Sequence, residues 1–124
     1  MGEGPGHVRD TELLLEECGL RAALRDVGKA TFVDLNNDEV HPVPTTTSLT
    51  ALSELWLPRS LLAADVVISM PKIKTHHWAG VTLSLKNLFG VVPGSVYGWP
   101  KNVLHWHGID NSIVELAATI PIHY

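Results

Sequence analysis

The hydrophobic pattern of this chain is organised around a short apolar run at residues 66–70, VVISM. A run of this length is typical of a buried strand, and Pro71 should end it because proline cannot donate to a sheet ladder. The basic segment KIKTHH follows at residues 72–77, and after Gly80 residues 81–89 return apolar side chains at helical spacing. A strand, a basic loop and a helix in this order predict a ligand site beyond the carboxyl end of the strand, as in open α/β folds.

Helical periodicity recurs towards both ends of the chain. Residues 11–27 predict a helix that Asp10 caps, that Gly19 weakens or splits, and that stops at Gly28. A last helix precedes Pro121. Between these helices, β-branched and alternating stretches predict strands at residues 31–35, 40–43 and 52–57.

These elements predict one α/β domain over residues 1–124, with a mostly parallel sheet flanked by helices. Residues 91–108 are rich in proline, glycine and aromatic side chains, and they predict a loop whose length is uncommon unless it is functional. The chain opens in a glycine-rich turn, and residues 122–124 resemble the start of a strand, so we expect a partial domain. A partial sheet has an unpaired edge, through which self-association is expected.

Composition and charge narrow the function classes. Of the 124 residues, 45% are hydrophobic and 18% are charged, which is typical of a globular protein. The net charge of −4 argues against nucleic acid as a partner. Cys18 is the single cysteine, so no internal disulfide or cysteine-ligated cluster can form within this chain, and a cytoplasmic location is expected. No apolar run approaches the roughly 20 residues of a membrane span, so no membrane partner is expected.

Cationic side chains gather in and after the basic segment. Lys72 and Lys74 are candidates for neutralising a phosphate or carboxylate, and Asn87 is a candidate polar contact. Lys86 lies among apolar positions, where burial would lower its pKa enough for it to act as a base or an amine nucleophile. The more ordinary reading is a lysine whose head reaches solvent. Lys86 and His76 are the candidate catalytic residues, His76 as an acid or a base, although the sequence names no reaction.

The glycine-rich turn at the start of the chain offers a second place for an anion. Gly4, Gly6 and His7 are candidate ligand-binding residues, because glycines let backbone N–H groups approach an anion before a helix. The turn is not a complete dinucleotide fingerprint, since His7 stands where a third glycine would fall. The alternative is a tight turn that feeds the following helix.

Two other functions compete with anion binding. The first is a metal site, for which imidazoles are suitable ligands, although adjacent histidines in an extended segment point in opposite directions. Its candidate ligands are His76, His77, His105 and His107. The second is a non-catalytic scaffold that docks an iron–sulfur partner through exposed indoles, although tryptophans more often pack loops onto a core. Its candidate residues are Trp78, Trp99 and Trp106.

Three stretches resemble the family known as domain of unknown function 362. They are GEGPGH at residues 2–7, FVDLN at residues 32–36 and ADVVISMPKIKTHHWAGVTLSLKNLFGVVPG at residues 64–94. The resemblance covers nearly the whole chain, and PKIKTH and SLKNLFG are its most specific strings.

The resemblance implies a metabolic context for the anion site and does not imply a reaction mechanism. Members of that family are sometimes joined to ferredoxin-type iron–sulfur modules, which implies a redox context and a ferredoxin-type module or protein as a partner. Members are also typically much longer than this chain. Because the chain lacks a cysteine cluster, an iron–sulfur centre would have to lie in missing sequence or in that partner. The cofactor itself stays unknown.

Overall fold

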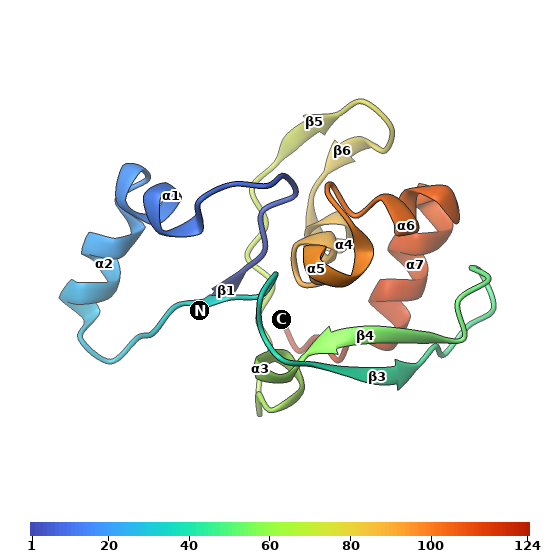
Figure 1. Ribbon diagram of the computed structural model, residues 1–124, viewed down its shortest axis with the longest axis horizontal. Helices are drawn as coiled ribbons and strands as arrows, with labels where there is room; N and C mark the ends of the chain where they lie inside the picture. Colours follow the sequence, from blue (N-terminus) through green and yellow to red (C-terminus); the bar gives the residue numbers. More distant parts are fainter.

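The computed structural model describes residues 1–124 as short helices and three two-stranded sheets (Figure 1). The strands are β1 (Gly2–Glu3), β2 (Val33–Asp34), β3 (Val40–Pro44), β4 (Glu54–Pro58), β5 (Lys74–His76) and β6 (Gly80–Thr82). The helices are α1 (Thr11–Glu17), α2 (Leu20–Val27), α3 (Arg59–Leu62), α4 (Ser84–Asn87), the 3-10 turn η1 (Leu88–Gly90), α5 (Gly94–Tyr97), α6 (Asn102–Trp106) and α7 (Ile109–Thr119). No helix is both long and apolar enough to cross a bilayer.

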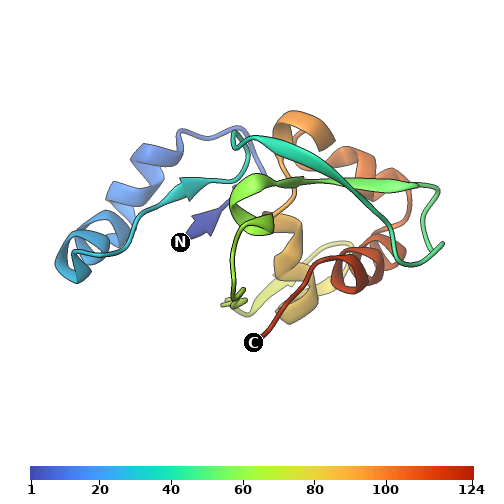
Figure 2. The same cartoon turned by 90° about the horizontal axis from the view of Figure 1, so that it is seen from below.

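The first part of the chain forms a small parallel unit. β1 pairs in parallel with β2, and α1 and α2 make the crossover between them. The side chain of Asp10 caps α1 by accepting from the backbone N–H of Leu13, and Gly19, at φ +75°, separates the two helices. Both features confirm the predicted split helix. The two helices extend away from the rest of the molecule (Figures 1 and 2).

The core lies between the β3–β4 hairpin and the C-terminal helices. β3 and β4 are antiparallel, and alternation along β4 turns Leu55 and Leu57 inward, where both are completely buried. Opposite them, Leu88 and Phe89 of η1 and Leu116 of α7 complete the centre of the core. The predicted strands at residues 40–43 and 52–57 and the predicted last helix are therefore confirmed, while their sheet is antiparallel.

Tyr97 closes the outer edge of β4. Its hydroxyl accepts a hydrogen bond of 2.7 Å from the backbone N–H of Trp56, and the ring is buried in the core. We expect Tyr97→Phe to lower the free energy of unfolding by about 1–2 kcal/mol, because the partly buried N–H of Trp56 loses its partner. Urea unfolding followed by circular dichroism measures this, with Tyr124→Phe, an exposed tyrosine, as the control. Equal stability of the two variants would contradict a stabilising hydrogen bond between Tyr97 and Trp56.

The prediction of a buried strand at residues 66–70 is wrong. This segment is extended and lies beside the chain terminus: Ser69 N–H donates to Tyr124 O over 2.7 Å, and His123 N–H donates to Val67 O over 3.0 Å. No further strand pairs with it, so Ile68 and Met70 are 61% and 85% exposed. Only Val67 turns toward the core. An apolar run becomes a buried strand only when neighbours cover both of its faces, and here they do not.

The helix predicted at residues 81–89 begins later than expected. Gly80, at φ +70°, reverses the chain, so Gly80–Thr82 becomes β6 and pairs antiparallel with β5. Helix α4 follows only from Ser84. The predicted loop at residues 91–108 also holds two short helices, α5 and α6. The α/β class is therefore confirmed. The predicted mostly parallel sheet is not confirmed, because one sheet is parallel and two are antiparallel.

Candidate functional site

The β5–β6 hairpin positions the basic segment over the C-terminal helices. In its register Lys74 faces Thr82, Thr75 faces Val81 and His76 faces Gly80. Opposite residues of an antiparallel pair share a face, so Lys74 and His76 lie on one side of the hairpin and Thr75 and Val81 on the other. His76 is half-buried, which identifies its side as the inward face.

A continuous series of ring contacts links the hairpin to α6 and the core. His76 stacks on His77 at a centroid distance of 5.0 Å, and the His77 ring lies 4.9 Å from that of Trp78. Trp78 meets His105 of α6 edge-on at 4.7 Å, and His105 lies 5.5 Å from Phe89. Trp78 and His105, which are 27 positions apart, are thereby brought together, and three of the four histidines singled out as candidates gather here.

Lys86 is the central cation of this group. Its Nζ atom lies 3.6 Å from the centroid of the Phe89 ring, in a cation–π contact. Burial, with the nearby charge of Lys74 adding to it, lowers the pKa of Lys86 to about 8. Every ion pair in the structure involves arginine or histidine, so the Lys86 ammonium has no acidic partner. We call Lys74, Lys86, His76, His77 and His105 the basic cluster.

The two half-buried histidines of the basic cluster present different atoms. Nδ1 of His76 accepts from the backbone N–H groups of Trp78 and Ala79, over 3.2 and 3.1 Å, so the proton of the neutral ring lies on Nε2. Nδ1 of His105 lies 2.9 Å from Lys101 O, a pure acceptor, so Nδ1 carries the proton and Nε2 is free to accept. Burial, together with nearby cationic groups, lowers the pKa of both rings.

Both histidines are consequently neutral at pH 7, and the positive charge of the cluster comes from its lysines. His76 can donate from Nε2 to an anion, but its accepting nitrogen is already occupied by the backbone. His76 was predicted to act as an acid or a base. The base role has no support in this geometry, whereas donation from Nε2 does, and the acid role stays a prediction.

The charge of the surrounding sequence explains why Lys86 is unpaired. Residues 66–109 contain four lysines and no aspartate or glutamate, so they carry +4 while the remaining residues sum to −8. This segregation was readable from the sequence and would have strengthened the prediction of a basic site. The net charge of −4 conceals it.

Two predicted ligand-binding residues take no part in the contacts of the basic cluster. Lys72 is exposed on the same arm and forms no ion pair. Asn87 donates from Nδ2 to Ser69 Oγ over 3.1 Å, so its side chain holds the extended segment instead of facing the cluster.

The glycine-rich turn is a packing element in this structure. Gly4 is buried, and a Cβ atom there would lie 2.5 Å from Gly90 O and 2.9 Å from Asn36 Oδ1. Glycine is therefore required at this position by close packing. Gly6 and His7 are exposed, and the Asp10 carboxylate already occupies the start of α1. The arrangement fits the alternative of a tight turn that feeds a helix.

A buried hydrogen-bond network beside that turn, the polar node of Lys101 and Asn36, was not predicted from the sequence. Lys101 is only 2% exposed, and its Nζ donates to Asn36 Oδ1, which also accepts from Gly94 N–H over 2.8 Å. Asn36 Nδ2 in turn donates to Pro5 O over 3.1 Å. Burial lowers the pKa of Lys101 to about 8, with the charge of Asp34 opposing the shift. A buried lysine next to an asparagine has no local sequence signal, because the two are 65 positions apart.

The geometry gives the metal-site and scaffold predictions less support than it gives anion binding. His107 takes part in none of the ring contacts, and no three His, Cys, Asp or Glu side chains are grouped so that they could hold a metal ion. Metal binding stays a prediction for metal analysis to test. Trp99 packs against Gly94 and under the Lys101 ammonium, whereas Trp78 and Trp106 are exposed.

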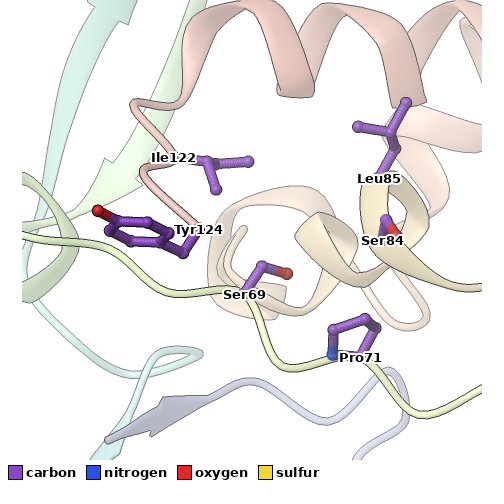
Figure 3. Close-up of a pocket in the computed structure, with 6 residues that line it drawn as sticks. All are labelled: Ser69, Pro71, Ser84, Leu85, Ile122 and Tyr124. Carbon is purple, nitrogen blue, oxygen red and sulfur yellow. The ribbon is translucent and has the colours of Figure 1, made fainter.

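The pocket shown in Figure 3 is lined by none of the predicted site residues, although one of its lining residues, Ser69, accepts the hydrogen bond from Asn87. It has a volume of about 160 Å³ and lies between the extended segment, α4 and the chain terminus. Its lining residues are Ser69, Pro71, Ser84, Leu85, Ile122 and Tyr124. None of them is charged, so this pocket is not the predicted anion site.

Comparisons with known proteins place the chain in a family. A protein named thylakoid-associated protein sll1697, from Synechocystis sp., is 40% identical over 57 residues, which is 46% of this chain and 16% of that protein. The chain therefore matches only a small part of that relative's length. No solved structure matches significantly. The family described as Domain of unknown function (DUF362) matches residues 1–124, the whole chain. The chain thus belongs to the DUF362 family, as the resemblance of its three stretches implied.

Proposed function

We propose that the basic cluster binds a small anionic ligand that carries a phosphate or carboxylate group. The observation that supports this most strongly is the half-buried Lys86 ammonium without an acidic partner. A partly desolvated cation without a counter-charge is costly in the free protein, and its cation–π contact with Phe89 leaves the charge unneutralised. An anion that reaches it gains a charge-assisted hydrogen bond and relieves that cost.

The neighbours of Lys86 suit the same ligand. Lys74 adds an exposed second cation, and the Nε2–H of His76 adds a neutral donor. A further role for Lys86 as a base or amine nucleophile belongs to this proposal, because a pKa of about 8 leaves roughly a tenth of the amine neutral at pH 7.

The experiment is calorimetric titration with inorganic phosphate, pyrophosphate and citrate. We expect Lys86→Met to lower the affinity for whichever of these anions binds most tightly by about tenfold or more, because one charge-assisted hydrogen bond is lost. Lys29→Met, which removes an exposed lysine outside the cluster, is the matched control. Wild-type affinity should also fall as pH rises above about 8, where Lys86 loses its proton. Affinity that is unchanged in Lys86→Met would refute the site.

The setting of this site is proposed from the family alone. We propose a redox context with a ferredoxin-type partner, on the resemblance to proteins that carry such modules, since Cys18 is the one cysteine of this chain. Cytoplasmic location and self-association likewise stay predictions.

A further inference from the structure

The outward face of the β5–β6 hairpin is apolar and has no partner in the chain. Thr75 and Val81 are opposite each other on this face, and alternation adds Ile73 on one arm and Leu83 on the other. Ile73 is 72% exposed and Val81 48% exposed. The usual arrangement, with polar residues outward, is reversed here, because Lys74 and His76 occupy the inward face.

The turn and the charge of the hairpin complete an amphipathic surface. Trp78, in the turn between the strands, is 58% exposed although one edge meets His105. Lys72 and Lys74 lie on the first arm and are exposed. No acidic residue occurs between residues 66 and 109. In Figure 1 the hairpin lies at the periphery of the molecule, where a flat surface can approach it.

We propose that this hairpin face docks the protein onto a membrane surface that contains anionic lipids. Apolar side chains and an indole fit the boundary between headgroups and acyl chains. Lys72 and Lys74 start from the other face of the same arm, but both are exposed, and their long flexible stems can carry the ammonium groups past the edge of the two-stranded hairpin to the negative headgroups. Such docking needs no spanning helix, so it is compatible with the absence of a long apolar run. A second copy of the chain fits less well, because a symmetric contact would bring two acid-free, positive surfaces together.

Membrane docking shares Lys74 with the basic cluster, but the variants chosen here separate it from small-anion binding. The hairpin variant Ile73→Ser plus Val81→Ser alters exposed side chains outside the basic cluster. The matched control is Leu13→Ser plus Val27→Ser, which removes two comparably exposed apolar side chains, 55% and 66% exposed, from α1 and α2. Circular dichroism confirms that each variant is folded before it is compared.

The test is co-sedimentation of the whole chain with vesicles of phosphatidylcholine alone and with vesicles in which about a third of the lipid is phosphatidylglycerol. We expect binding to the anionic vesicles only, weakened about tenfold in the hairpin variant and unchanged in the control. Roughly 1 M NaCl should weaken binding by screening the lysines. The hairpin variant should still bind pyrophosphate as wild type does, and Lys86→Met should still bind vesicles.

Several results would overturn the proposal. Absence of wild-type binding to anionic vesicles, or equal binding by the hairpin variant, would remove it. Binding that free phosphate abolishes would assign the effect to a headgroup-sized anion site and not to a docking surface. If light scattering shows a wild-type dimer, and the hairpin variant is monomeric while the control variant stays dimeric, a second copy of the chain covers this face.

Discussion

Asn36→Leu is expected to lower the free energy of unfolding by about 3–5 kcal/mol, because it leaves several buried polar groups without partners at once. Oδ1 of Asn36 accepts from the buried Lys101 ammonium and from Gly94 N–H, and Nδ2 satisfies Pro5 O. Leucine has a similar size but none of these atoms. Lys101 is the costliest group to leave unpaired, since it carries charge and is 2% exposed.

Urea unfolding followed by circular dichroism measures the loss. The matched control is Asn37→Leu, which removes the neighbouring amide, an exposed group that donates to Asp34 Oδ2 over 2.9 Å. The control should cost less than about 1 kcal/mol. Adding Lys101→Met to Asn36→Leu should recover part of the loss, because the unpaired cation is then gone. Equal effects of Asn36→Leu and Asn37→Leu would contradict the role of the node.

Glu115→Gln is expected to lower the free energy of unfolding at pH 7 by about 2–4 kcal/mol. Glu115 is 1% exposed on α7 and has no cationic partner. Oε1 accepts from Thr47 N–H and Oγ1 over 3.1 and 2.7 Å, and Oε2 accepts from Thr50 N–H and Oγ1 over 3.2 and 3.3 Å. Whichever way a glutamine turns, its NH₂ group faces a backbone N–H that also donates.

The loss caused by Glu115→Gln should depend on pH. Burial by itself would raise the pKa of Glu115, but the hydrogen bonds from Thr47 and Thr50 outweigh it and hold the pKa below the ordinary 4.5. The unfolded chain therefore binds this proton first on acidification, and the stabilisation present above pH 4.5 disappears as pH falls through the folded-state pKa.

Urea unfolding of wild type and variant at about pH 7 and about pH 4 tests this sign. The difference in unfolding free energy between the two proteins should be smaller at the lower pH. Glu17→Gln, at the exposed end of α1, should show little difference at either value. A difference that grows on acidification would contradict the hydrogen-bonded carboxylate.

Local features of the site were predictable and its assembly was not. The alternation that places Lys74 and His76 on one face follows from strand geometry, and Lys86 stood out as a cation among apolar positions. The meeting of His105 with Trp78 depends on how the turn between β5 and β6 packs on α6. Asn87 and Gly4 were assigned to ligand binding because their residue types suit it, whereas their contacts within the fold serve packing.

The sequence by itself determined the helices at both ends, the split at Gly19, the strands β3 and β4, and the concentration of lysines near the chain's middle. These depend on side-chain period, backbone freedom and composition, which act over a few residues. Only the tertiary structure decided that residues 66–70 stay exposed, that Gly80 starts a strand, and that Lys101 and Glu115 are buried among polar partners. Burial and pairing depend on what packs across from a residue, and the residues that pack there come from distant parts of the chain.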